Sequence, residues 1–443
     1  MHAVDRAVAA FIRHKRAALS RAVPAPVRRI GRVEAVRGLA LSATLPGARV
    51  GGLVEVDAGA ARVPAEVVGF EGPRATFMVL GEARGVSSGA VVRAAPGEFT
   101  VRCGDFLLGR VLDGLGRPID GRPPPRAGAE VPVGGRAPDP LARLPVRGAF
   151  ETGIRAIDGM LTLGRGQRVG LFAGSGVGKS TLLGQIARHA RADVNVVCLV
   201  GERGREVGEF IRDALGPAGL ARSVVVCATG DQPPMVRVKC AHVATAIAEH
   251  FRDRGGDVLL MMDSVTRFAR AQREVGLAAG EPPARQGYPP SVFRVLPELL
   301  ERAGNGARGS MTAIYTVLVA GGDMEEPIAD EVRGILDGHV VLSRELAARG
   351  HYPAIDVLAS VSRVMPAVAD TAHRAAAGRV RALLGRYEAG RDLISIGAYR
   401  PGCDAALDEA VARMPAIDGF LRQENDRPAR LGETTAALDG LAV

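Results

Sequence analysis

Short, strongly apolar runs recur along the middle of the chain, and helical patterns separate several of them. Uninterrupted apolar runs of this length indicate strands that are buried on both faces, as in a parallel sheet covered by helices. The runs that predict strands are Val169–Ala173, Val196–Val200, Val224–Ala228, Val258–Asp263, Thr312–Val319 and Val340–Leu342. The sequence therefore predicts an α/β domain, which we place at residues 98–368.

The regions on either side follow different patterns. Between Ile30 and Ala95, glycines cut short valine-rich runs at a spacing of roughly 8–12 residues, which predicts a small antiparallel β-barrel at residues 29–97. Residues 110–140 include a proline-rich stretch and are expected to form a connecting loop. After Thr371 the chain is rich in Ala, Arg and Leu, so residues 369–443 are predicted to form a C-terminal helical domain.

Residues 1–28 show a third pattern. The apolar residues Val4, Val8, Phe11, Ile12 and Leu19 lie at helical spacing with basic residues between them, which predicts a basic amphipathic helix. Such a helix suits a protein partner or an anionic membrane surface. The alternative is a solvated helical arm that packs on its own domain.

The net charge of +9 is concentrated at this end of the chain. Residues 1–32 hold eight basic side chains and one acidic one, a net charge of +7, so the other 411 residues supply +2. A nucleic-acid motor would spread positive charge through its body, and a chain without Trp has few aromatics for stacking on bases. The charge pattern therefore argues against nucleic acid as a partner.

The composition indicates a globular cytoplasmic protein with two or three domains. The chain is 47% hydrophobic and 24% charged, and it has no run of about 18 apolar residues that could span a membrane. Arg6, Arg13 and Arg16 interrupt the apolar stretch that a signal peptide needs. Five scattered cysteines, at positions 103, 198, 227, 240 and 403, form no metal-ligand spacing, and we expect buried thiols in a reducing compartment.

A glycine-rich segment, Ala173–Ser180, follows the first strand of the α/β domain and precedes an apolar helix. This arrangement is the P-loop pattern, in which backbone N–H groups surround phosphates. Lys179, one of three lysines in the chain, is predicted to reach the outer phosphates, and Ser180 to hold Mg²⁺. The residues expected to contact nucleotide are Gly174, Ser175, Gly176, Val177, Gly178, Lys179, Ser180 and Thr181. Ala173 stands where the strict pattern has glycine.

Two further strand ends carry acidic residues. The run Val196–Val200 is followed by Glu202, our candidate for the base that polarises the attacking water, and by Arg203, which could steady phosphate charge. The alternative for this pair is a surface cluster of ion pairs. The run Val258–Asp263 is a Walker B pattern, in which Asp263 holds Mg²⁺, and Arg267 lies one helical turn further on.

Together these motifs resemble the catalytic subunits of rotary-type ATPases, and most of all the type III protein-export ATPases. The resemblance covers about residues 28–425 and rests on Ala173–Ser180, Gly201–Glu206, Val258–Phe268, Gly350–Asp356 and Ser360–Arg363. It implies a RecA-like P-loop core between an N-terminal β-barrel and a C-terminal helical domain. Within the group, Gly280–Ala284, Gly287–Phe293, Ala303–Gly306 and Arg391–Tyr399 resemble the flagellar branch. Ala at the position of Ala173 is common among the export ATPases that the chain resembles.

The resemblance also implies roles for residues whose chemistry is not evident from their own pattern. Tyr352 would stack on the adenine of ATP, and Tyr399 would close the other side of the base. Arg363 would be an arginine finger that reaches into the site of a neighbouring subunit, which implies a homohexamer. The implied partners are regulatory or stator-like and stalk-like export proteins, export chaperone–substrate complexes, the membrane export gate and an acidic membrane surface.

The prediction is therefore a flagellar-type export ATPase, cytoplasmic and peripherally bound to the inner membrane. A virulence-type injectisome ATPase would share all of this chemistry. Two less favoured alternatives are an RNA translocase of RecA-like fold and a nucleotide-binding scaffold without turnover. Glu202 and Arg363 argue against the scaffold, because binding alone needs neither residue.

Overall fold

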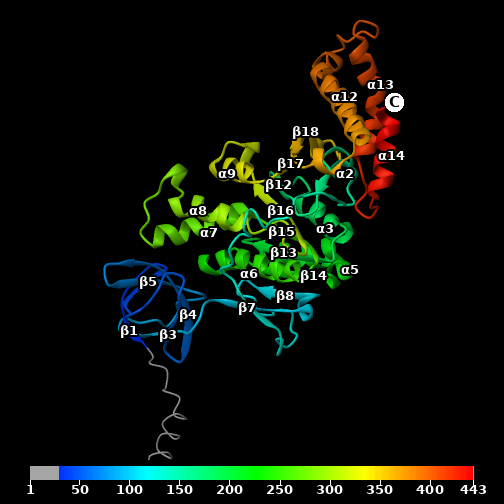
Figure 1. Cartoon of the computed structure of the whole chain (residues 1–443). Coiled ribbons are helices and arrows are strands. Elements are labelled where there is room, and N and C mark those ends of the chain that lie inside the picture. Colours follow the sequence, from blue (N-terminus) through cyan, green and yellow to red (C-terminus); the bar gives the residue numbers. More distant parts are fainter. Residues whose placement is uncertain (1–28, 443) are drawn as a thin grey trace, which may run out of the picture.

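The computed structural model describes residues 29–442, and the helix expected within residues 1–28 lies outside them. A barrel and a helical C-terminal region lie at opposite ends of a central α/β core (Figure 1). This architecture confirms the predicted fold class.

The barrel is closed, with strand order β1-β2-β5-β4-β3-β6 and pairing of β6 with β1. Its strands are β1 (Ile30–Arg37), β2 (Ala40–Thr44), β3 (Leu53–Ala58), β4 (Ala61–Glu71), β5 (Arg74–Val79) and β6 (Val91–Ala94). Alternate residues such as Val54, Val56 and Phe77 fill the interior, as expected for a small barrel. Lys239 of the core forms an ion pair of 2.5 Å with Glu66 of β4, which ties the barrel to the core.

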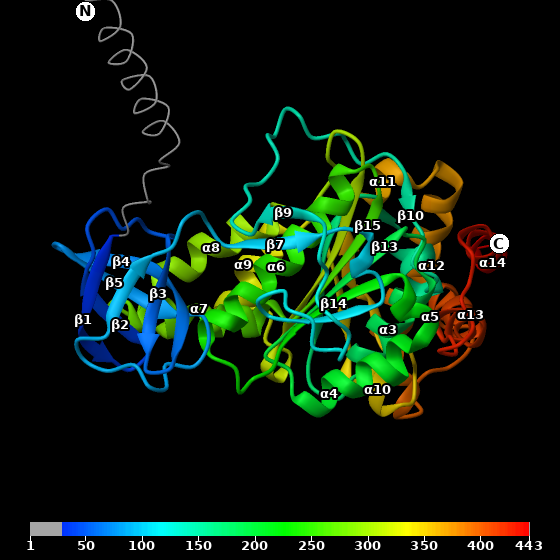
Figure 2. The ribbon, with the colours of Figure 1, turned by 90° about the horizontal axis from the view of Figure 1, so that it is seen from below.

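The connecting segment is more ordered than the sequence indicated. β7 (Thr100–Cys103) pairs with β9 (Ala129–Pro132) beside the core (Figure 2). β8 (Arg110–Asp113) joins the central sheet in parallel to β14, so the expectation of a loop over residues 110–140 is wrong at both β8 and β9. The Arg110 guanidinium holds the Asp120 carboxylate with bonds of 2.6 and 3.0 Å, which fixes the turn after β8.

The central sheet has eight strands in the order β18-β17-β12-β16-β15-β13-β14-β8. Its other strands are β12 (Arg168–Ala173), β13 (Val194–Val200), β14 (Ser223–Ala228), β15 (Asp257–Asp263), β16 (Ser310–Leu318), β17 (Gly338–Leu342) and β18 (Ile355–Ser362). All pairs are parallel except β17 with the edge strand β18. Each of the six predicted strands is present, with ends within two residues of those expected.

Alternate residues of each central strand face two separate hydrophobic cores. Val196 and Cys198 pack in the core that contains helices α6 to α9, whereas Val197 and Leu199 pack with α2, α3 and the C-terminal helices. The core helices are α2 (Arg155–Met160), α3 (Lys179–His189), α4 (Gly204–Glu209), α5 (Gly216–Ala221), α6 (Pro234–Asp253), α7 (Val265–Ala278), α8 (Pro290–Leu300), α9 (Pro327–Ile335), α10 (Arg344–Ala348) and α11 (Met365–Val368). Burial on both faces explains why these strands read as continuous apolar runs.

Three helices form the C-terminal region: α12 (Thr371–Ser395), α13 (Ala405–Leu421) and α14 (Leu431–Ala442). The α12–α13 hairpin extends away from the sheet, and α14 returns to pack against α2 and α12 (Figure 1). The five cysteines are free thiols; four are buried as expected, but Cys403, in the loop between α12 and α13, is exposed.

Candidate active site

The P-loop joins the end of β12 to the start of α3, and two of its glycines have backbone conformations that other residues rarely adopt. Gly176 and Gly178 have φ of 77° and 85°, in the left-handed region that favours glycine. A Cβ on Gly174 would lie 2.6 Å from the Arg344 guanidinium. The loop can therefore turn tightly and present its backbone N–H groups at the carboxyl edge of the sheet.

Lys179 lies between two carboxylates at this edge. Its Nζ forms a close ion pair with Asp263 Oδ1 and lies 3.7 Å from Glu202 Oε1. Lys179 begins α3 after the P-loop, Glu202 lies two residues after β13, and Asp263 ends β15; all three side chains are largely buried. The structure therefore brings together the three residues that the sequence singled out.

Glu202 is in an environment that favours its protonated form. Burial raises its pKa to about 7, and the nearby Asp263 carboxylate adds to the rise, against the opposing effect of Lys179. The Arg267 guanidinium holds both carboxylate oxygens, with Nε–Oε1 of 3.1 Å and Nη2–Oε2 of 3.2 Å. A carboxylate with a pKa near neutral can take a proton from water, so Glu202 has the properties of a general base.

Asp263 is oriented by a residue that the sequence analysis did not identify. The Thr316 hydroxyl, inside the apolar strand β16, donates a bond of 2.7 Å to Asp263 Oδ1. Ser180 and Thr181 lie exposed in the first turn of α3 on the same side of the sheet. Hydroxyl and carboxylate oxygens are the ligands that Mg²⁺ prefers.

Arg203 follows Glu202 but its side chain points elsewhere. It is 78% exposed and forms an ion pair of 3.2 Å with Glu206 in the first turn of α4. The contact forms part of a capping arrangement at the start of that helix. In this geometry Arg203 does not contact Lys179, Glu202 or Asp263.

A pocket of about 610 Å³ lies beside the P-loop and is large enough for a nucleoside. Its walls include Gly178, Thr181, the Tyr352–Pro353 turn and residues 423–426 after α13. A Cβ on Gly178 would lie 3.4 Å from the Tyr352 ring, so this aromatic face is next to the loop that holds phosphates. Tyr352 therefore lies beside the P-loop, and its stacking on a base stays a prediction.

Gln423 also lines this pocket, next to Tyr352, a contribution that the sequence analysis missed. It is buried, accepts a bond of 2.8 Å from Arg155 N and donates to the carbonyls of Gly153 and Arg427. Its backbone N–H also donates to the Tyr352 carbonyl at 2.9 Å. These bonds hold the C-terminal segment against the pocket.

The structure does not bring Tyr399 to this pocket. Tyr399 lies in the loop between α12 and α13, and its hydroxyl donates a bond of 2.6 Å to Asp408. The C-terminal residues that line the pocket, 423–426, come instead just after Leu421, the last residue of α13. Tyr399 therefore lies at the other end of the helical hairpin from Gln423.

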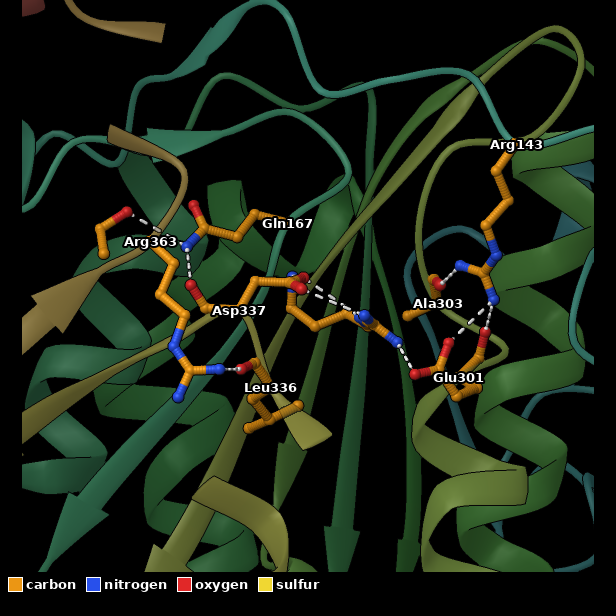
Figure 3. Close-up of polar contacts among 9 residues, drawn as sticks. Arg143, Gln167, Glu301, Ala303, Leu336, Asp337 and Arg363 are labelled. Atoms are coloured by element: carbon orange, nitrogen blue, oxygen red, sulfur yellow. Dashed lines mark hydrogen bonds and ion pairs between the residues drawn. The ribbon is translucent and has the colours of Figure 1, made fainter. Parts of the chain in front are cut away.

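Arg363 lies at the opposite edge of the sheet from the P-loop. Its backbone N–H donates a bond of 3.0 Å to the carbonyl of Asp337, and the Asp337 carboxylate accepts from the backbone N–H of Arg168, the first residue of β12. The six residues of β12 span about 20 Å, so Arg363 cannot reach the phosphates bound by its own subunit. Figure 3 shows Arg363 and Asp337 at this edge.

A P-loop lysine, a buried glutamate that can accept a proton and a Walker B aspartate at one sheet edge define the class of P-loop nucleoside triphosphatases. Residues 153–362 match the nucleotide-binding domain of the ATP synthase alpha/beta family, and residues 369–440 match the T3SS EscN ATPase C-terminal domain. The chain belongs to the ATP synthase alpha/beta family, in the group that contains the flagellum-specific and type 3 secretion ATPases. The family and the enzyme class predicted from the sequence are confirmed.

Curated relatives match nearly the whole chain. The flagellum-specific ATP synthase of Bacillus subtilis (strain 168) is 50% identical over 94% of this chain and 95% of its own length. The type 3 secretion system ATPase of Xanthomonas euvesicatoria is 56% identical over 84% of this chain and 85% of its own. The assembled ATPase EscN of enteropathogenic E. coli, solved with its central stalk EscO, has a TM-score of 0.86 and is 46% identical, over 93% of this chain and all of its own.

Among residues 29–442, no helix is both long enough and apolar enough to cross a membrane.

Proposed function

We propose that this protein hydrolyses MgATP to drive protein export by the flagellar type III apparatus, as a homohexamer with its active sites at subunit interfaces. The observation that carries the proposal is the division of the site between two edges of one sheet. Lys179, Glu202 and Asp263 meet at the carboxyl edge, whereas Arg363 is exposed about 20 Å away at the amino edge. A second copy of the chain can supply the missing guanidinium.

The residues at the carboxyl edge fit a Mg²⁺–nucleotide. Ser180 and Asp263 would hold the ion, whose chemistry is to neutralise charge on the β- and γ-phosphates. The P-loop N–H groups and Lys179 bind the phosphates, and Tyr352 stacks on the base within the pocket. Each of these contacts orients the triphosphate for attack at the γ-phosphorus.

Glu202 positions the attacking water and accepts its proton. Its raised pKa suits this task near neutral pH, because a stronger acid would be a weaker base. Arg267 holds the carboxylate in one orientation through both oxygens. Arg363 of the neighbouring subunit then stabilises the negative charge that develops on the γ-phosphoryl oxygens.

Partners follow from the family and from the relatives. EscN has been solved with a central stalk, and we propose that this chain also contacts a stalk-like export protein. Regulatory or stator-like proteins, export chaperone–substrate complexes and the membrane export gate complete the proposed set. The basic residues 1–28 would associate with acidic membrane surfaces at the cytoplasmic side of the inner membrane.

A second candidate function is the same hydrolysis in an injectisome, because the Xanthomonas relative is a type 3 secretion ATPase of similar identity. The two can be separated by expressing this chain in strains that lack one or the other ATPase. Restored motility supports the flagellar proposal. Restored secretion of injectisome substrates alone would favour the second candidate.

The shared site is tested by the ATPase rate as a function of protein concentration, with and without acidic lipid vesicles. We expect the specific activity to rise cooperatively as subunits assemble. Analytical ultracentrifugation at the same concentrations shows whether the rise follows ring formation. A specific activity that stays constant down to the monomer would contradict a site shared between subunits.

A further inference from the structure

The side chain of Arg363 is held only weakly. It is exposed, and its Nη1 makes one long contact of 3.4 Å with the carbonyl of Leu336. In the described part of the chain, no carboxylate lies within ion-pair distance of its guanidinium. An exposed guanidinium with so few contacts within its own chain is available to a group outside it.

The backbone of Arg363 is, in contrast, firmly anchored. Its N–H and the Nε2 of the buried Gln167 both donate to the Asp337 carbonyl, at 3.0 and 3.2 Å. Gln167 Nε2 also lies 3.2 Å from the hydroxyl of Ser362. The position of the Arg363 Cα therefore depends on Asp337.

Asp337 would also be the natural acidic partner for the Arg363 side chain, but both of its carboxylate oxygens are already engaged. Arg168 donates to Oδ2 from its backbone N–H at 3.0 Å and from Nε at 3.1 Å, and to Oδ1 from Nη2 at 3.1 Å. A fork of this kind is among the stronger charge-assisted contacts in proteins. Both carboxylate oxygens of Asp337 are therefore held by Arg168 and not by Arg363.

Arg168 is itself fixed from the other side, by the end of helix α8. Its Nη1 forms an ion pair of 2.5 Å with Glu301, which follows the last residue of α8. Arg143, on the loop before α2, pairs with Glu301 at 3.2 Å and donates to the carbonyl of Ala303 at 2.8 Å. Figure 3 shows these contacts as one row along the amino edge of the sheet.

We propose that Arg168 is a positioning residue for Arg363: it occupies the Asp337 carboxylate so that the Arg363 guanidinium stays free for the neighbouring subunit. Glu301 and Arg143 support Arg168 and link it to helix α8. The inference rests on the proposed function, in which Arg363 acts in trans. It assigns to these residues an effect on the rate of hydrolysis and not on nucleotide binding, since they lie at the edge away from the P-loop.

The first test is Arg168→Gln in the full-length protein. The freed Asp337 then captures Arg363, and we expect kcat to fall by about 10- to 100-fold while KM for ATP stays within about twofold, because a small misplacement of a reacting group has this size of effect. The matched control is Glu298→Gln, which breaks the exposed ion pair with Arg294 on α8, one turn before Glu301. That variant should keep the wild-type kcat, and an Arg168→Gln enzyme with wild-type kcat overturns the proposal.

Subunit mixing separates this role from a general loss of structure. Arg168→Gln damages the half of the site that supplies the finger, so mixing it with Lys179→Ala subunits should restore activity at mixed interfaces. Mixing it with Arg363→Ala should restore none, since both variants lack the same half. If Arg363→Ala is rescued by Lys179→Ala but Arg168→Gln is not, the positioning role is wrong while the trans finger stands. If neither is rescued, the trans finger itself fails.

A second-site change tests the capture directly. Asp337→Asn removes the competing charge, so the double variant Arg168→Gln/Asp337→Asn should recover much of the kcat lost by Arg168→Gln alone. The melting temperature of each variant is measured alongside to confirm folding. A double variant that folds like the single one but is no faster, or is slower, would show that Asp337 does not capture Arg363.

Discussion

The two edges of the central sheet carry opposite kinds of chemistry. At the carboxyl edge, Lys179, Glu202 and Asp263 are largely buried and paired with one another. At the amino edge, Arg363 is exposed, and the acid next to it is engaged by another arginine. The charged groups of the carboxyl edge pair within the chain, whereas the guanidinium at the amino edge is exposed at the surface.

Under the proposed function, this difference means that the chain has a complete nucleotide-binding site but only part of a catalytic one. A buried, internally paired cluster is formed on folding, and we expect it to bind nucleotide in any state of assembly. An exposed guanidinium stabilises a transition state only when a second subunit brings phosphates to it. Catalysis can thus be made conditional on assembly without any change in how nucleotide is held.

The largest effect is expected at the exposed edge. Arg363→Ala should lower kcat by about 10³- to 10⁵-fold, the range known for arginine fingers, with nucleotide affinity little changed. Steady-state ATPase assays and equilibrium binding of a fluorescent nucleotide measure the two quantities. Mixing with Lys179→Ala subunits should restore part of the activity, and a lack of rescue at every ratio would contradict the division of the site between two edges.

At the paired edge, Glu202→Gln should lower kcat by about 10²- to 10⁴-fold while ATP still binds, because the amide cannot accept a proton. The same change should raise the melting temperature above pH 7, since it removes a buried charge that costs stability. Glu209→Gln, in an exposed ion pair with Arg205 on the adjacent helix α4, is the matched control. Turnover at the wild-type rate in Glu202→Gln would remove Glu202 from its role as base.

The pH dependence sharpens the same comparison. Since burial and the Asp263 carboxylate raise the pKa of Glu202 to about 7, kcat/KM should fall about tenfold per pH unit below pH 7 and level off above it. The free energy of unfolding changes in the opposite direction. It falls as the pH rises from about 4.5 to 7, because Glu202 ionises at a cost in the folded state, and this cost is fully present above pH 7. A kcat/KM profile that is flat from pH 5.5 to 8 would show that Glu202 does not titrate in this range.

A smaller effect is expected at the base pocket. Tyr352→Ala should weaken ATP binding by about tenfold, because stacking of a base on an aromatic ring is worth about 1–3 kcal/mol. Tyr399→Ala should leave the affinity within about twofold, since its hydroxyl is bound to Asp408 away from the pocket. Isothermal titration of both variants with a non-hydrolysable ATP analogue tests the pair. Equal losses of affinity would contradict the assignment of the base contact to Tyr352 and not to Tyr399.

The carboxyl edge could be predicted from the sequence because each of its residues follows a visible apolar run. Thr316 could not, since a threonine inside an apolar strand has no pattern of its own, and Gln423 approaches the pocket only through tertiary packing of the C-terminal helices. The strand β8 was missed because it has only four residues, between Gly109 and Gly114. The network around Arg168 joins residues more than a hundred positions apart, and such pairs are invisible without a fold.

Strand β18 has a consequence for how successive sites in a ring would communicate. It begins just after the Tyr352–Pro353 turn and, because it runs antiparallel to its neighbour, ends one residue before Arg363. A single strand of eight residues therefore connects the base pocket of one site to Arg363, which the proposed function places in the next site. In the ring of the proposed function, each subunit would bind the adenine at its own site and place Arg363 at the γ-phosphate of the next site. All interfaces would therefore be coupled in the same direction around the ring.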